Sequence, residues 1–499
     1  MNALAVLYGG SLTRAAFEPL FPGKNALTLA LEQARRFPGV TKLVLLADLC
    51  PALPADVSLV SRPAWTKKTL LQTLSELSGG FDCTYYAWAD CPLLDPVLAG
   101  TLLERHLCYH AEYSYADGWP YGLAPELLAP GVAGILANIL GEDDAGPVER
   151  DALFSVIQKD INAFDIETEI SSIDLRVHRL SLSADSRRNL LLLTRLMDAG
   201  LSSAADSERI ISAHPELLRT LPAFYSIQVS GPCPQACSLC PYPKFSTPGF
   251  MEPVRFAALL DKISAFSGDA VLDLSLWGEF SLHPQKRELI TAILERPALS
   301  AVIETSGLGW KKAELEALAE AASKAAPREN RMAPLSWIVS LDAADANRYR
   351  EIRGPGFAEA VECAKTLTAL FPKDSYVQAV RVKGAEDDIE HFYRSWKKEG
   401  AEVIIQKYDD FCGAMPKLQA SDLSPVQRRP CWHLMRDMAI LMDGRVPLCR
   451  ETEGEILGNA FTESLETIWS RGEAFYREQA ALHYRGPCAG CDEYYTYNF

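Results

Sequence analysis

The sequence is short of positive charge, of histidine and of long hydrophobic runs. Its 499 residues carry 49 Lys and Arg against 65 Asp and Glu, a net charge of −16, so the cationic surface that nucleic acids require is not expected. No run of about 18 apolar residues indicates a membrane span. The start, MNALAVLYGG, lacks the basic residues and cleavage site of a secretory signal. We therefore expect a cytoplasmic protein without a nucleic-acid or membrane partner.

Cysteine, in contrast, is plentiful. The chain has 13 cysteines, an odd number in a large chain expected in the cytoplasm, which is poor support for a disulfide framework. The 8 histidines are scattered along the chain. Metal ligation by thiols becomes the leading explanation for the cysteines.

The length predicts two or three domains, and the pattern is α/β almost throughout. Between about 221 and 410, short apolar strands alternate with helix-length segments, which predicts an open partial (β/α)6 barrel. Chemistry is expected in the loops at the carboxyl ends of such strands. The six predicted strands are 224–230, 270–276, 300–305, 336–341, 376–382 and 402–408.

A second α/β pattern precedes the barrel, with strands predicted at 3–8, 42–47 and 83–89. The segment 185–201 predicts a closing helix, and the polar stretch SSAADSER after it predicts the boundary. After about residue 411 the pattern is irregular and rich in cysteine. We therefore predict three parts, 1–205, 221–410 and 411–499.

Three cysteines follow the first barrel strand: Cys233, Cys237 and Cys240, spaced C-x3-C-x2-C. A structural zinc site needs four protein ligands, whereas a cubane cluster held by three cysteines leaves one iron open. On spacing alone, a zinc loop or three buried thiols remain alternatives.

At this position the motif resembles that of the radical S-adenosylmethionine (SAM) enzymes. The resemblance implies a 4Fe-4S cluster on the three cysteines, with SAM bound at the open iron. It further implies reductive cleavage of SAM to a 5′-deoxyadenosyl radical, which abstracts hydrogen from a substrate. An electron donor such as flavodoxin or ferredoxin is implied as well.

Later strand ends extend the resemblance. LSLWGEF is similar to the family's Gly-Gly-Glu segment, with Trp277 in place of one glycine. Taken singly, such residues are more often turn or cap residues than ligand contacts. The resemblance implies five SAM contacts, Gly278, Glu279, Ser306, Ser340 and Arg353, with Gln378 and Arg381 as weaker candidates.

A second cysteine set forms a complete group of four: Cys431, Cys449, Cys488 and Cys491. Four thiolates satisfy zinc as well as iron-sulfur. The surrounding DGRVPLC and LGNAFTESLETIW resemble the SPASM extension or its shorter twitch form. Because the chain stops eight residues after Cys491, the resemblance implies one auxiliary 4Fe-4S cluster with an electron-transfer or architectural role.

The other cysteines show no ligand spacing, and we predict small buried side chains. They are Cys50, Cys83, Cys91, Cys108, Cys363 and Cys412. Cys412 is left open, because its loop follows the sixth barrel strand and could face the active site.

In the first part, YAWADCPLLDP places Asp90 at a strand end, and the order of segments resembles GT-A nucleotidyltransferases, especially cytidylyltransferases. The resemblance implies that Asp90 helps to hold Mg²⁺ and a nucleotide. Two departures point to a degenerate or binding-only domain. The loop with Gly9, Gly10, Arg14 and Lys24 lacks the family spacing, and Ser183 stands where a second aspartate is expected.

Over nearly its whole length the chain resembles the spiro-SPASM group. This implies a radical SAM enzyme acting on an unidentified substrate, either a nucleotide-linked sugar or related envelope precursor, or a peptide. The alternatives are a non-catalytic, zinc-stabilised binding protein and an active sugar nucleotidyltransferase fused to a radical SAM module. The sequence identifies no general acid or base.

Overall fold

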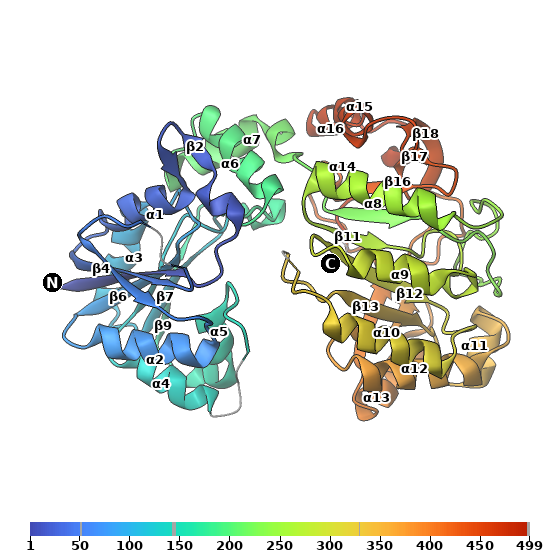
Figure 1. The fold of residues 1–499 in the computed structure, drawn as a ribbon, viewed down its shortest axis with the longest axis horizontal. Helices are drawn as coiled ribbons and strands as arrows, with labels where there is room; N and C mark the ends of the chain where they lie inside the picture. The colour runs from blue at the N-terminus through green and yellow to red at the C-terminus, as the bar shows by residue number, and fades with distance from the viewer. Residues whose placement is uncertain (50–51, 142–145, 329, 497–499) are drawn as a thin grey trace. The chain divides into compact units, whose positions relative to one another are not determined.

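The computed structural model describes residues 1–49, 52–141, 146–328 and 330–496, and the chain divides into two compact units, Met1–Leu217 and Leu218–Phe499 (Figure 1). Each unit is built on its own seven-stranded sheet. Cys50, predicted to be buried, lies outside the described residues. None of the helices in the described ranges has the length and apolar character of a membrane span.

The first sheet has the strand order β5-β4-β1-β6-β8-β7-β9. Its central strands are the three predicted ones, β1 (Ala3–Gly9), β4 (Val40–Ala47) and β6 (Cys83–Trp88), which run parallel. β1 and β6 are buried along their whole length, which explains their continuous apolar sequences. The strands missed from sequence are shorter: β5 (Val57–Ser61), β7 (Tyr113–Asp117), β8 (Glu126–Leu128) and β9 (Ile166–Ile170).

A small ribbon and seven helices complete the first unit: β2 (Pro19–Phe21), β3 (Lys24–Asn25), α1 (Ala26–Ala34), α2 (Lys67–Ser78), α3 (Pro96–Cys108), α4 (Val132–Leu140), α5 (Ala152–Ile157), α6 (Arg187–Asp198) and α7 (Ala204–Ala213). The stretch SSAADSER, at which the boundary is predicted, contains the start of α7. The Asp95 carboxylate, which caps α3, also accepts a 2.7 Å hydrogen bond from the Ala204 amide. α7 therefore belongs to the first unit.

The second sheet is entirely parallel, in the order β15-β14-β13-β12-β11-β10-β16. All six predicted barrel strands form, as β10 (Phe224–Ile227), β11 (Ala270–Asp273), β12 (Leu299–Thr305), β13 (Leu335–Ser340), β14 (Ser375–Arg381) and β15 (Glu402–Lys407). The helices after these strands are α8 (Pro253–Ser267), α9 (Lys286–Leu294), α10 (Lys312–Lys324), α11 (Ala346–Ile352), α12 (Phe357–Leu370) and α13 (Glu386–Lys398).

The seventh strand, β16 (Asp437–Ile440), comes from the cysteine-rich C-terminal segment and pairs in parallel with β10, Ile227 opposite Ile440. The sequence did not reveal it, because four residues without a βα repeat give no periodic signal. The remaining elements of this segment are α14 (Trp432–Arg436), β17 (Arg445–Cys449), β18 (Thr452–Asn459), α15 (Leu465–Arg471) and α16 (Glu473–Ala480). The division between 221–410 and 411–499 stays a prediction, and the barrel sheet itself extends across it.

A buried arginine holds the C-terminal helices to the start of the second unit. Arg219 donates to the carbonyl oxygens of Leu434 at 2.8 Å and Trp469 at 2.9 Å, and its guanidinium lies 3.5 Å from the centre of the Trp469 ring. Such a contact combines charge-assisted hydrogen bonds with a cation–π interaction. The segment that carries the second cysteine set is thus fixed to the barrel.

Replacing Ile440 tests whether β16 is integral to the barrel. Ile440 is fully buried beside β10, so we expect Ile440→Ala to lower the free energy of unfolding of the second unit by about 2–5 kcal/mol. Hydrogen exchange of β10 peptides in increasing denaturant measures this loss. Val254→Ala, at a site 81% exposed in α8, serves as control and should change little. Unaltered β10 protection in Ile440→Ala would contradict the pairing.

Candidate functional site

The three thiols of the first motif line a cavity of ≈ 490 Å³ at the carboxyl ends of the barrel strands. Their loop leaves β10 and is tied down on both sides. The Cys233 amide donates to the Tyr242 hydroxyl at 3.2 Å, and the Ser238 amide donates to the Ile352 carbonyl at 2.8 Å. Backbone amides of the loop are therefore hydrogen-bonded both to a side chain of the same loop and to the backbone at Ile352.

The same cavity contains all five predicted SAM contacts. They are Gly278, Glu279, Ser306, Ser340 and Arg353. The Glu279 amide donates to the Pro232 carbonyl at 2.9 Å, which joins the end of the second strand to the cysteine loop. Its carboxylate accepts hydrogen bonds from the Thr305 hydroxyl at 2.6 Å and the Ser306 amide at 2.7 Å. The fold thus brings together residues that are far apart in sequence.

The two residues before Glu279 explain why glycine suits this turn. Trp277 has a φ of 51°, in the left-handed region that glycine adopts without strain. Its ring packs on Phe245, with 4.8 Å between ring centres, which offsets the backbone strain. At Gly278, an added Cβ would lie 1.8 Å from the Ser230 carbonyl oxygen. The second glycine is required by close backbone approach, whereas the first position tolerates a buried tryptophan.

Ser340 belongs to a hydrogen-bonded group on the barrel wall. Its hydroxyl donates to Glu304 at 2.7 Å, and the Gln378 amide donates to the same carboxylate at 2.8 Å. Gln378 also lines the cavity. Arg381 instead donates to the Ser421 hydroxyl at 2.9 Å, and it is not among the residues that form this cavity in the described ranges.

Arg353 is paired within the protein. It donates to Asp342 at 2.6 Å, and this carboxylate is buried. Burial raises the pKa of the Cys237 thiol to about 11, although the positive charge of Arg353 lowers it. Burial likewise raises the pKa of Cys233 to about 12. Thiolates here therefore need a bound cation to form at neutral pH, as a metal cluster provides.

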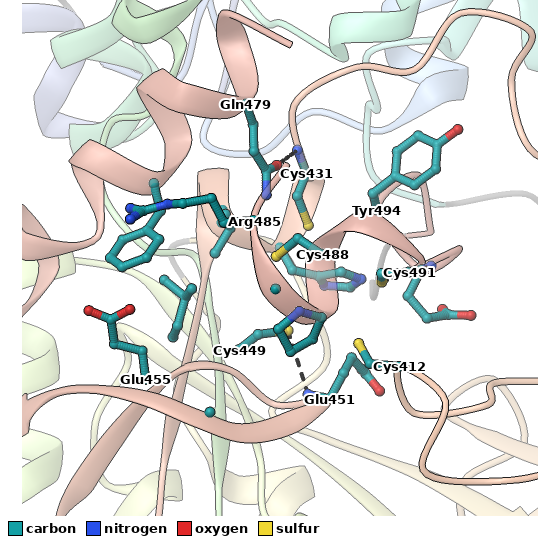
Figure 2. Close-up of a pocket in the computed structure, with 18 of the residues that line it drawn as sticks. Cys412, Cys431, Cys449, Glu451, Glu455, Gln479, Arg485, Cys488, Cys491 and Tyr494 are labelled. Carbon is teal, nitrogen blue, oxygen red and sulfur yellow. Dashed lines mark hydrogen bonds between the residues drawn. The ribbon is translucent and has the colours of Figure 1, made fainter. Parts of the chain in front are cut away.

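The second cysteine set lines a cavity of ≈ 180 Å³ in the C-terminal segment (Figure 2). Cys431 precedes α14, Cys449 ends β17, and Cys488 and Cys491 lie on one short loop. The Glu451 amide approaches the Cys449 sulfur at 3.5 Å. The Glu493 amide approaches the Cys491 sulfur at 3.3 Å, and amide donors of this kind stabilise cluster thiolates.

A fifth cysteine, Cys412, lies in the same cavity. Its thiol donates a hydrogen bond to the Cys491 sulfur, which raises the pKa of Cys412 and lowers that of Cys491. The loop places it there through three successive left-handed residues, Phe411, Cys412 and Gly413. Cys412 therefore faces the second cysteine set. From the sequence, only its position after the sixth barrel strand was known.

Of the other cysteines predicted to be buried, Cys83, Cys91 and Cys363 are buried. The prediction is wrong for Cys108, which is exposed as the last residue of α3.

Glu451 lines both cavities. Arg450 pairs with it at 2.7 Å, and Asp409 lies against it from the loop after β15. Burial, and then the charge of Glu451, raise the pKa of Asp409 well above its usual range. The wall between the cavities is thus made of ionisable side chains that the sequence did not single out.

In the first unit, Asp90 is buried near the end of β6. The backbone amide of Ala184, the residue after Ser183, donates a 2.8 Å hydrogen bond to the backbone carbonyl oxygen of Asp90. Both carboxylate oxygens of Asp90 are taken by Arg150, at 2.8 and 2.6 Å. The residue expected as a second aspartate, Ser183, is buried and bonds to Ser181 at 2.7 Å. Asp185, two residues later, pairs with the same Arg150 at 3.0 Å.

Comparison with known proteins identifies the C-terminal segment and a relative. Residues 431–492 match the SPASM family, described as an iron-sulfur cluster-binding domain. An uncharacterised protein of Treponema pallidum (strain Nichols) is 38% identical over 361 residues, covering 70% of this chain and 98% of that protein.

Two solved structures share parts of the fold. Streptococcus suis SuiB bound to the precursor peptide SuiA has a TM-score of 0.43 at 15% identity, covering 58% of this chain and 75% of SuiB. A cytidylyltransferase from Leptospira borgpetersenii has a TM-score of 0.35 at 17% identity, covering 43% of this chain and 95% of that enzyme.

A cysteine loop on a parallel sheet therefore precedes a segment that matches an iron-sulfur cluster-binding domain. The chain belongs to the same family as the Treponema pallidum protein.

Gly278→Ala tests the close approach at the first site. Because the added methyl would collide with the Ser230 carbonyl, we expect the cysteine loop to shift and the iron retained by Cys233, Cys237 and Cys240 to fall. Iron analysis in a Cys431→Ala, Cys449→Ala background isolates this site. Gly79→Ala is the control, since its Cβ meets only the Glu76 carbonyl at 3.9 Å. Full iron retention in Gly278→Ala would argue against this packing.

Cys412→Ala tests the fifth thiol. We expect the auxiliary iron to be retained and its reduction potential to fall, because one hydrogen bond to a ligand sulfur is lost. Iron counting and a redox titration measure the two effects. Cys108→Ala, at an exposed cysteine, should change neither quantity. Loss of about four irons in Cys412→Ala would instead make Cys412 a ligand.

Proposed function

We propose that the protein is a radical SAM enzyme in which Cys233, Cys237 and Cys240 hold the catalytic 4Fe-4S cluster. The observation that carries this proposal is that the three thiols and all five predicted SAM contacts share one cavity. When bound, the cluster and SAM supply a 5′-deoxyadenosyl radical that abstracts hydrogen from a substrate. Three thiols leave one iron free of protein ligands, as this chemistry requires.

The chain's own residues position SAM. The segment at Gly278 and Glu279 offers backbone carbonyls for the SAM amino group, and the Glu279 carboxylate holds the Ser306 turn in place. Ser340 and Arg353 line the opposite wall, where Arg353 is oriented by Asp342. Glu279 therefore acts partly by positioning its neighbours, because its oxygens already accept hydrogen bonds from protein donors.

We assign one auxiliary 4Fe-4S cluster to Cys431, Cys449, Cys488 and Cys491. Residues 431–492, which include these four cysteines, match an iron-sulfur cluster-binding domain, and this match favours iron-sulfur over a structural zinc. With four protein ligands the cluster has no iron open to substrate, which favours electron transfer. Glu451 next to Cys449 lines the catalytic cavity as well, so the two sites are separated by a thin wall of side chains.

The substrate proposed from sequence remains a nucleotide-linked sugar or related envelope precursor, or a peptide, handled in the cytoplasm. SuiB, with which this chain shares part of its fold, is seen bound to a precursor peptide. A binding assay with a panel of nucleotide sugars tests the first class. Saturable binding of one nucleotide sugar would support this substrate class, and the absence of binding for every member of the panel would argue against it.

Anaerobic reconstitution tests the proposed chemistry. We expect about eight irons per chain, and 5′-deoxyadenosine when dithionite and SAM are added. The variant Cys233→Ala, Cys237→Ala, Cys240→Ala should keep about four irons and form no 5′-deoxyadenosine. A matched variant, Cys431→Ala, Cys449→Ala, Cys488→Ala, should lose the auxiliary iron and still cleave SAM. Zinc in place of iron, with SAM left intact, would support the non-catalytic binding protein instead.

A further inference from the structure

In the N-terminal unit, the side chain of Arg150 occupies the position at Asp90 where nucleotidyltransferases of the GT-A type hold a metal ion. Asp90 is 1% exposed, and Arg150 meets it through two parallel hydrogen bonds, Nη1 to Oδ1 at 2.8 Å and Nη2 to Oδ2 at 2.6 Å. This is the bidentate geometry in which arginine binds a carboxylate most strongly. Asp90 therefore has neither oxygen free to face a metal ion in the manner of its family.

A second carboxylate converges on the same guanidinium. Nη2 of Arg150 also donates to Asp185 Oδ2 at 3.0 Å. Asp185 is in turn held by the Asn189 amide at 2.7 Å. Two carboxylates from distant parts of the chain thus meet around one positive group, which is the arrangement that a divalent cation would require.

Aromatic rings fix Arg150 in this position. Its guanidinium carbon lies 4.0 Å from the centre of the Trp88 ring and 5.3 Å from that of Tyr121. A planar guanidinium stacks on such rings, whereas a hydrated Mg²⁺ ion needs oxygen ligands around it. The two rings therefore hold the guanidinium between the carboxylates, in the place that a metal ion would need.

A basic residue of the first loop is also engaged within the protein. Lys24 pairs with Glu32 at 2.6 Å on the surface of the first unit.

We propose that Arg150 is the permanent cation of this site, so that the N-terminal unit binds no divalent metal at Asp90 and performs no metal-dependent nucleotidyl transfer. The two carboxylates form a latent metal site that removal of the guanidinium exposes. The proposal does not depend on the radical chemistry of the second unit.

Mn²⁺ binding to the full-length chain tests this directly, measured by equilibrium dialysis with metal analysis. Asp90→Asn should leave the Mn²⁺ bound by the otherwise unaltered protein unchanged. Arg150→Met should gain about one Mn²⁺ per chain, and Arg150→Met, Asp90→Asn should lose it again, because a divalent ion needs the oxygen ligands that the first change frees. Loss of bound Mn²⁺ in Asp90→Asn alone would overturn the proposal.

Arg176→Met provides a matched control. Arg176 also bridges two carboxylates, Asp117 at 2.7 Å and Asp174 at 2.8 Å, but its side chain is 57% exposed and the site is open to water. This variant should gain no Mn²⁺. Arg150→Lys keeps the charge and should gain none either, and a gain there equal to that of Arg150→Met would overturn the proposal that the positive charge at this position excludes the metal.

Folding is monitored by hydrogen exchange of β1 and β6 peptides. If Arg150→Met is folded and gains no Mn²⁺, the latent site is refuted. If Arg150→Met fails to fold, the proposal is tested by comparing the Mn²⁺ bound by Asp90→Asn with the Mn²⁺ bound by the unaltered protein. NTP turnover with Mg²⁺ in the unaltered protein, abolished by Asp90→Asn, would also overturn the proposal.

Discussion

The pairing of β16 with β10 is the constraint on which the arrangement of both cysteine sites depends. β10 leads directly into the loop with Cys233, and β16 lies between Cys431 and Cys449. Because the two strands are adjacent and parallel, their carboxyl ends meet at one edge of the sheet. The cavity lined by Cys233 and the cavity lined by Cys449 are therefore fixed relative to each other by backbone hydrogen bonds, and Glu451 lines both.

Within each unit, a partly buried arginine neutralises a buried carboxylate at the end of a strand. Arg353 pairs with Asp342 beside the cysteine loop, and Arg150 pairs with Asp90 in the first unit. A buried carboxylate without a partner is strongly destabilising, so such pairs are retained even where they give little net stability. In the second unit the paired arginine still faces a cavity, whereas in the first unit its hydrogen bonds occupy both oxygens of Asp90. The pair of an arginine with a buried carboxylate thus leaves the cavity of the second unit open, whereas in the first unit it covers the carboxylate of Asp90.

The six barrel strands were predictable because each is a short apolar run followed by a helical pattern, and their order placed Gly278, Glu279 and Ser306 at successive strand ends. The spacing of the second cysteine set was equally readable, and the match to an iron-sulfur domain confirms it as a SPASM segment. β16 was not predictable, since a four-residue strand is defined by its neighbour rather than by its own periodicity. The conformation of Trp277 was not predictable either, because only its packing on Phe245 explains a large residue at a turn that suits glycine.

The sequence by itself determined which residues are candidates for the chemistry, because thiol spacing and the alternation of strands and helices are local properties of the chain. The tertiary structure alone decided how distant residues meet. It placed Cys412 against Cys491, brought Asp409 to Glu451, and closed Arg150 over both Asp90 and Asp185. These contacts join segments far apart in the chain, and their partners are selected by packing and by the neutralisation of buried charge. Neither requirement leaves a periodic trace in the sequence.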